Sequence, residues 1–127
     1  MSETGQPPTS PAPEKDSAAR ERPDERLKAM LAELWLRNRG AVLDRVAILR
    51  GALARAAEGR LDETSRLRAV DAAHKLAGVL GTFGLPRGTE FAREAEEAFG
   101  GARAGGIDCA RLDRIVSELA EMVRSKS

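Results

Sequence analysis

His74 is the one histidine of the chain, and two glycines follow it within an apolar helical pattern, Gly78 at i+4 and Gly81 at i+7. Residues at these spacings lie along one face of a helix. A glycine inside a helix costs about 0.8–1 kcal/mol relative to alanine, so two of them need a reason. Bare backbone beside an imidazole lets another surface approach the ring closely. The spacing therefore indicates a histidine that a partner can reach.

Other chemistry for this histidine is weakly supported. A lone histidine on a helix is most often a surface or half-buried residue, and the two glycines equally permit tight contact with a neighbouring helix. The sequence predicts no metal site, because there is no second histidine and the single Cys109 has no neighbouring ligand. Ser65 and Thr82 lie on the same predicted helix, and nothing places either of them against His74 as a nucleophile.

Composition favours one small helical domain. The chain has 127 residues, of which 42% are hydrophobic and 3% aromatic, and good helix formers dominate it. The formal net charge is only +1, from 21 basic and 20 acidic side chains, which argues against nucleic-acid binding through a basic patch. No apolar run approaches the roughly 18 residues of a membrane span, and no signal region begins the chain. We expect a cytoplasmic monomer with no membrane contact, and Cys109 as an ordinary small residue near the start of the last helix.

The elements that must position His74 are helices. Residues 1–22 are rich in Pro, Ser, Thr and Glu, which predicts a disordered tail. The apolar spacing and the Asp, Gly and Pro signals then predict helices over about 24–39, 41–58, 62–83, 86–99 and 108–124. Gly40 marks a break or a bend, and the first helix is either a lid across one end or a continuation of the second. The prediction is an all-α domain over residues 23–127, an antiparallel four-helix bundle with an extra N-terminal helix.

The third predicted helix has a distinct inner face. Its apolar residues begin with Leu67 and Val70, and at about 100° per residue the core direction is set by Ala69, Ala73, Leu76, Ala77 and Leu80. His74 lies about 110° from that direction, and Asp71 and Lys75 point broadly toward water. The histidine therefore occupies a boundary position, where its stem packs and one nitrogen meets solvent. Asp71, at i−3, either orients the ring or is a solvated charge.

Residues 73–84, AHKLAGVLGTFG, resemble the signature of histidine-containing phosphotransfer (HPt) domains of bacterial phosphorelays. In that family the phosphoaccepting histidine is followed by leucine at +2, usually lysine at +3, and glycine at +4. Leu76 and Gly78 match, whereas Ala77 replaces the lysine and Val79 the small +5 residue. Lys75 is the nearest alternative cation, and the sequence does not rank it against Arg87 and Arg93 of the next helix.

The resemblance implies that His74 carries a phosphoryl group, on the outer ring nitrogen Nε2, between aspartates of response-regulator receiver domains. A hybrid sensor histidine kinase is the implied source, and the receiver supplies Mg²⁺, so no cofactor is expected on this chain. Lys75 and Asp71 are the implied phosphate-stabilising or orienting residues, and Gly78, Gly81 and Ala77 the implied docking residues. Such a domain is a phosphocarrier, not an ATP-binding kinase. The alternatives are a helical adaptor that docks a receiver or kinase without carrying phosphate, and a purely structural bundle.

Overall fold

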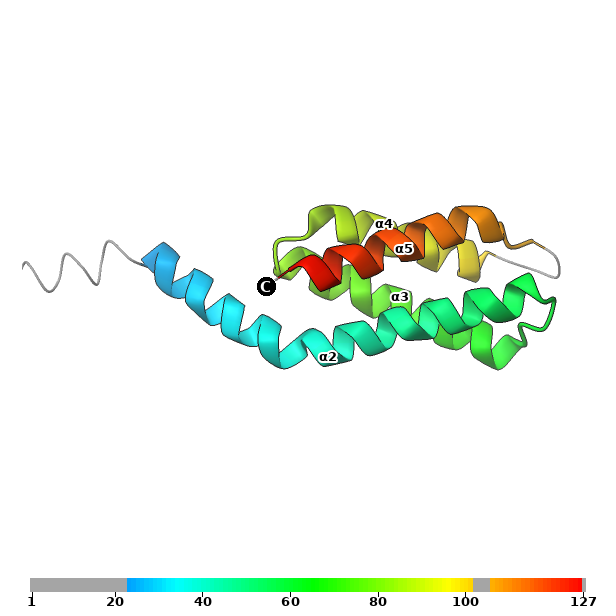
Figure 1. The fold of residues 1–127 in the computed structure, drawn as a ribbon, viewed down its shortest axis with the longest axis horizontal. Coiled ribbons are helices and arrows are strands. Elements are labelled where there is room, and N and C mark those ends of the chain that lie inside the picture. Colours follow the sequence, from blue (N-terminus) through cyan, green and yellow to red (C-terminus); the bar gives the residue numbers. More distant parts are fainter. Residues whose placement is uncertain (1–22, 102–105, 127) are drawn as a thin grey trace, which may run out of the picture. The chain divides into compact units, whose positions relative to one another are not determined.

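The described residues form four helices, whose arrangement Figure 1 shows. The computed structural model describes residues 23–101 and 106–126. The helices are α2 (Pro23–Ala57), α3 (Glu63–Thr82), α4 (Pro86–Gly100) and α5 (Cys109–Ser125), and the described ranges contain no strand. The predicted all-α helical bundle is confirmed. The predicted tail, residues 1–22, lies outside the described residues.

Of the break or bend predicted at Gly40, the break is wrong, because α2 runs without interruption from Pro23 to Ala57. The first expected helix is therefore a continuation of the second, which was one of the two alternatives. A glycine costs a helix about 1 kcal/mol, and the alanine, leucine and arginine residues around Gly40 offset that cost. The chain divides into two compact units between Leu34 and Trp35. In the first unit, the helical turns over residues 23–34 leave Leu27 and Met30 more than half exposed.

The second unit, Trp35–Ser127, contains the hydrophobic core. Its largest fully buried side chains are Trp35, Phe99, Leu49, Leu76, Leu80, Leu112, Leu119, Val42, Val116 and Val123. On α3 the buried face is mostly alanine, including Ala69, Ala72 and Ala73, which lets neighbouring helices approach closely. At one end Trp35 meets Phe83 edge to face, with ring centroids 5.3 Å apart, and the Trp35 indole N–H donates to the Lys126 carbonyl at 3.4 Å.

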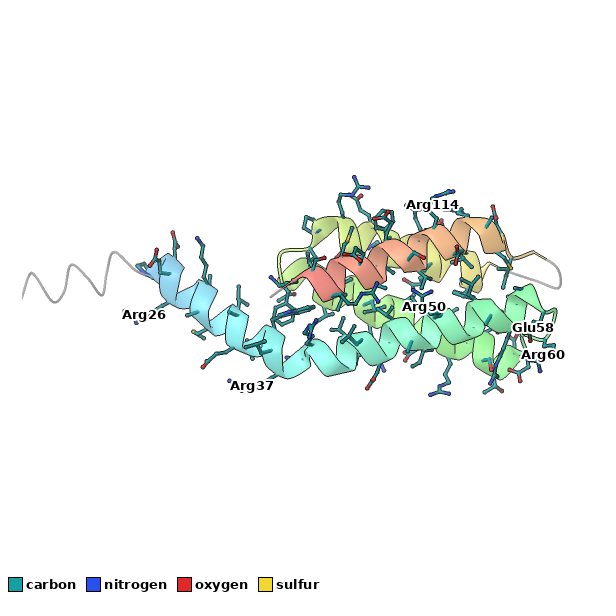
Figure 2. All side chains as sticks on the ribbon, viewed as in Figure 1. Arg26, Arg37, Arg50, Glu58, Arg60 and Arg114 are labelled. Carbon is teal, nitrogen blue, oxygen red and sulfur yellow. The ribbon has the colours of Figure 1, made fainter. Side chains whose placement is uncertain are left out.

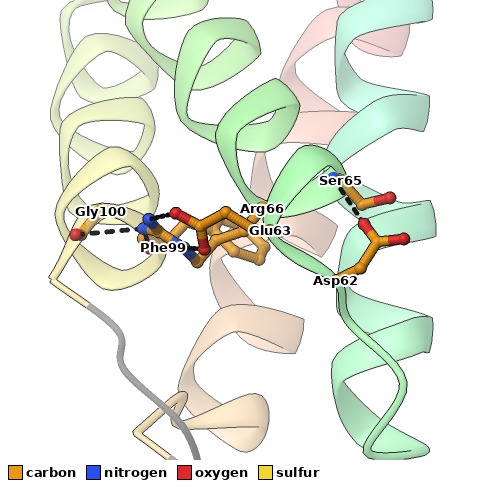
Figure 3. A network of polar contacts seen from close by, with 6 residues as sticks. All are labelled: Asp62, Glu63, Ser65, Arg66, Phe99 and Gly100. Carbon is orange, nitrogen blue, oxygen red and sulfur yellow. Dashed lines mark hydrogen bonds and ion pairs between the residues drawn. The ribbon is translucent and has the colours of Figure 1, made fainter.

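Local signals set the ends of the helices. The Asp62 carboxylate caps α3 by accepting the Ser65 N–H at 2.7 Å (Figure 3), and Asp108 caps α5 in the same way through Arg111. Such caps contribute about 1 kcal/mol each. Gly84 has φ +80° in the turn before α4, a left-handed conformation that suits glycine. Pro86 then begins α4, where its missing N–H is not needed. The predicted helix starts at Asp62, Pro86 and Asp108 are confirmed.

The turn between α2 and α3 holds an exposed ion pair between Glu58 and Arg60, labelled in Figure 2. Gly59 has φ +70° in this turn, which explains why α2 ends just before it. Within α3, by contrast, Arg66 makes polar contacts with residues more than 30 positions away in the sequence.

Arg66 joins the start of α3 to the end of α4 (Figure 3). One of its terminal nitrogens donates to the carbonyls of Phe99 at 2.7 Å and Gly100 at 3.2 Å. The remaining guanidinium donors bind both carboxylate oxygens of Glu63. A cation thus satisfies the last carbonyls of α4, where the helix dipole favours positive charge. This contact helps to fix α4, the helix that lies against His74, in position along α3.

Candidate functional site

His74 stands on the outside of α3, with 73% of its side chain exposed. The residues around it on the helix, Ala73, Leu76 and Ala77, are buried and anchor this stretch of α3 in the core. The ring is therefore held at a fixed place on the bundle while most of its surface stays open to solvent. A macromolecular partner can reach it without any opening of the fold.

Glu96 of α4 determines which ring nitrogen is free. Its Oε2 lies 3.0 Å from Nδ1 of His74, and the Glu96 side chain is 31% exposed. An ionised carboxylate only accepts hydrogen bonds, so Nδ1 carries the proton that it donates. In the neutral ring the lone pair is then on Nε2, which is the nucleophilic nitrogen. The contact also fixes the orientation of the ring.

Sequence reasoning missed Glu96 because it lies 22 positions after His74 and on another helix. Its neighbours Glu94 and Glu97 have the same chemistry. Only the packing of α4 against α3 distinguishes among the three. Glu94 is bound instead to Arg111 of α5 at 3.1 Å.

Asp71 and Lys75 form an ion pair with each other, with Nζ and Oδ2 3.0 Å apart at i,i+4 spacing. Both side chains are more than half exposed, and such surface pairs contribute little, about 0.3–0.5 kcal/mol. The ammonium of Lys75 can therefore leave Asp71 at small cost. In this structure the carboxylate on the ring belongs to Glu96 and the Asp71 carboxylate is on Lys75.

The two glycines of the motif differ in their surroundings. A Cβ added at Gly78 would meet no atom within 4 Å, whereas one at Gly81 would come within 3.1 Å of the Thr89 hydroxyl. That hydroxyl donates to the Ala77 carbonyl at 2.9 Å, which places Gly81 in the contact between α3 and α4. Ala77 itself is only 8% exposed. Packing between helices thus explains Gly81, while the described residues give no internal reason for Gly78.

Two arginines of α4 were candidate cations. Arg87 lies over the Phe91 ring, 5.2 Å from its centroid. Arg93 is exposed and stands three residues before Glu96, so the two share one face of α4. Of the two arginines, Arg93 is therefore the one on the same face of α4 as Glu96, whose carboxylate contacts His74.

Leu67, the first of the apolar residues noted on the predicted third helix, is 52% exposed. It precedes His74 by seven residues and so lies on the same side of α3, while Val70, at i−4, is half-buried. The face that carries the imidazole therefore also presents apolar surface. Leu67 is therefore an exposed apolar side chain on the same side of α3 as His74.

Two features that the described residues lack bear on the kind of site. In residues 23–101 and 106–126 no three His, Cys, Asp or Glu side chains are grouped as metal ligands. Over the same ranges, no helix combines the length and apolar character needed to cross a bilayer.

Together, the helical bundle and the exposed imidazole bound by a carboxylate define a helical domain that displays one histidine on its surface. The Hpt domain family matches residues 31–125, and the chain belongs to this family. Hpt domains serve histidine phosphotransfer in two-component signalling, as phosphocarriers rather than kinases, and interact with response regulators and kinases.

A further relative is Protein RcaC of Microchaete diplosiphon, which is 37% identical to this chain over 73 residues. The match covers 58% of this chain but only 11% of RcaC, so the chain corresponds to a small part of that protein. No solved structure matches the chain.

Proposed function

We propose that His74 accepts a phosphoryl group from an aspartyl phosphate of a receiver domain and returns it to an aspartate of another. The observation that carries this proposal is the exposed His74 ring with Nδ1 bound by Glu96 at 3.0 Å. This arrangement leaves Nε2 as the nucleophile and leaves its approach open. Family membership supplies the reaction class.

In the proposed step the Nε2 lone pair attacks phosphorus in line with the aspartyl oxygen. The P–O bond breaks, its electrons return to the aspartate carboxylate, and an N–P bond forms. Phosphoryl transfer depends mainly on position and charge, so the chain needs little covalent machinery. The ring becomes more cationic as Nε2 bonds to phosphorus, and the Glu96 carboxylate stabilises that charge through Nδ1–H.

The transferred phosphoryl group brings negative charge to the surface of α3. The Lys75 ammonium can pair with the phosphoryl group instead of Asp71, because the exposed ion pair of Lys75 and Asp71 is weak. Arg93 supplies a second cation from α4. Mg²⁺ and the acidic pocket belong to the receiver, and the chain itself needs no cofactor.

Docking in this proposal uses the bare backbone of Gly78, where a Cβ would have open space on all sides among the described residues. A receiver loop can approach the ring over this glycine, and Leu67 offers an apolar contact on the same face. Gly81 and Ala77 act mainly through the contact of α3 with α4. The upstream donor in this scheme is the receiver of a hybrid sensor histidine kinase.

A second candidate is an adaptor that binds a receiver without taking phosphate, favoured by Ala77 at the position where the family usually has lysine. One experiment separates the two. The full chain is mixed with a receiver domain phosphorylated on aspartate, and acid-labile phosphate on the chain is measured. We expect labelling of wild type and none of His74→Gln, with unchanged helicity by circular dichroism. Binding of the receiver without any labelling of wild type would establish the adaptor instead.

A further inference from the structure

A small groove lies between α2 and α3, outside the His74 site. Its volume is about 140 Å³, and its lining residues are Ile48, Gly51, Ala52, Arg55, Ser65 and Arg68. The first three give it an apolar floor, and the last three bring two guanidinium groups and a hydroxyl. Such a combination suits a group with a short apolar stem and an anionic end.

The charge of the groove is positive. Arg55 donates to the Ser65 hydroxyl at 2.8 Å. Hydrogen bonds from Ser65 are the main cause of the lowered pKa of Asp62, and the positive charge of Arg55 lowers that pKa further. Arg68 is exposed and, among the described residues, makes no hydrogen bond or ion pair. The groove therefore presents one guanidinium whose donors are all available to a ligand.

Gly51 keeps the groove open. A Cβ built on it would meet no atom within 4 Å, and its backbone has no positive φ that would require glycine. Neither packing nor conformation therefore accounts for a residue that costs α2 about 0.8–1 kcal/mol relative to alanine. A side chain at this position would enter the groove that Gly51 lines.

The groove is within reach of a partner that covers His74. Arg68 precedes His74 by six residues, which is about 9 Å along the axis of α3 and about 120° around it. The exposed Asp71 and Lys75 lie on the surface between them. A standard protein interface covers about 800 Å² on each partner, so a contact centred on His74 extends this far.

We propose that this groove receives an acidic side chain, aspartate or glutamate, of the receiver domain that docks on His74. The stem of that side chain lies on Ile48 and Ala52, and its carboxylate accepts hydrogen bonds from Arg68. The inference rests on the proposed function and adds to it a contact that sets affinity and choice of partner. Arg68 is then a docking residue with no role in the chemistry at Nε2.

The test compares Arg68→Ala with Arg114→Ala, an exposed arginine of α5 labelled in Figure 2. The probe is the phosphorylated receiver that labels the wild-type chain fastest among the receivers of the same genome. We expect Arg68→Ala to lower kcat/KM for transfer about tenfold, as for loss of a charged hydrogen bond, with kcat at saturating receiver unchanged. Its kcat/KM should also depend less on salt, while Arg114→Ala should match wild type.

A second pair of variants fills the groove without removing charge. Gly51→Leu places a side chain in the groove, and Gly40→Leu is the matched control, because a Cβ at Gly40 also meets no atom within 4 Å. Both changes favour the helix, so both variants should fold. Only Gly51→Leu should raise KM. Substituting the complementary acidic residue of the receiver by arginine should restore transfer to Arg68→Glu and impair it with wild type.

The outcomes separate this inference from the proposed function. If wild type is labelled but Arg68→Ala and Gly51→Leu keep wild-type kcat/KM, the groove has no docking role and only the inference fails. If no receiver labels wild type, both fail. Inorganic phosphate that raises the melting temperature of wild type but not of Arg68→Ala, with receiver kinetics unchanged, would make the groove a free-anion site and overturn the docking assignment.

Discussion

The two sides of α3 hold their polar groups in different ways. On the side that meets α4, contacts cross between helices: Glu96 binds His74, Thr89 binds the Ala77 carbonyl, and Arg66 binds the end of α4. On the solvent side, Asp71 and Lys75 bind each other, one turn apart. Contacts between packed helices fix a side chain in place, whereas a pair on one exposed turn can rearrange at little cost. The ring of His74 therefore belongs to the rigid side, and Lys75 to the adaptable side.

The largest expected effect comes from the open position beside the ring. Gly78→Arg should reduce transfer from a phosphorylated receiver by at least about 100-fold, because a long side chain would stand where the partner approaches. The structure has open space at this glycine, so the fold should remain intact. Labelling is followed by acid-labile phosphate and folding by circular dichroism. Rapid transfer by a folded Gly78→Arg variant would exclude the docking role of this residue.

The next effect tests the contact that fixes the ring. Glu96→Gln should slow transfer about 10- to 100-fold, since a partner that orients an imidazole is typically worth that much. Glu97→Gln is the matched control on an exposed neighbour. The ring tautomer, read from the 15N chemical shifts of His74, separates the roles, because only loss of the Glu96 carboxylate should remove the preference for a proton on Nδ1. Equal rates for both variants would show that Glu96 does not orient His74.

A smaller effect concerns the stability of the rigid side. Gly81→Ala should lower the free energy of unfolding by about 1 kcal/mol, because its Cβ would come within 3.1 Å of the Thr89 hydroxyl. Gly78→Ala should raise it by about 0.5–1 kcal/mol, since the helix gains propensity in open space. Urea denaturation measures both. If the two variants shift the midpoint in the same direction, the proposed difference between these glycines is wrong.

A pH effect should come from the start of α3. Hydrogen bonds that Ser65 donates to the Asp62 carboxylate lower the pKa of Asp62, and those that Arg66 donates lower the pKa of Glu63. A lowered folded-state pKa adds stability above the unfolded pKa, and that stability is lost as pH falls through the folded value. Asp62→Asn with Glu63→Gln should therefore flatten the loss of stability below about pH 5. The asparagine still caps the helix. If the free energy of unfolding of the double variant falls with pH as steeply as that of wild type, Asp62 and Glu63 do not cause the loss of stability in acid.

The smallest effect is expected on the adaptable side. Asp71→Asn should change stability by less than about 0.5 kcal/mol, as for other exposed ion pairs. Transfer should stay within about twofold of wild type, because Glu96 and not Asp71 contacts the ring. A drop as large as that of Glu96→Gln would assign the orienting role to Asp71 after all.

Much of this fold was predictable because its signals are local. Asp62, Pro86 and Asp108 act on the backbone within one turn, so the sequence placed the starts of three helices correctly. Gly40 misled the prediction because a single glycine weakens a helix by less than the surrounding residues stabilise it. The exposure of His74 agreed with its calculated position between core and solvent.

The components of the site that were not predicted depend on contacts between helices. Nothing in the run of acidic residues on α4 marks Glu96 as the one beside His74. Leu67 reads as a core residue from hydrophobicity, but its direction on α3 is that of the histidine. The groove at Arg68 likewise needs two helices to be placed side by side.

The single tryptophan of the chain gives these experiments an optical readout. Trp35 is fully buried, edge-on to Phe83, with the Lys126 ammonium 5.7 Å from its ring centroid. Its emission therefore reports on whether Lys126, just after α5, is seated against the bundle, and it should shift to the red when this residue detaches. Because the chain contains no tyrosine, excitation at 280 nm would read this one ring, and partners without tryptophan could be titrated without any attached dye.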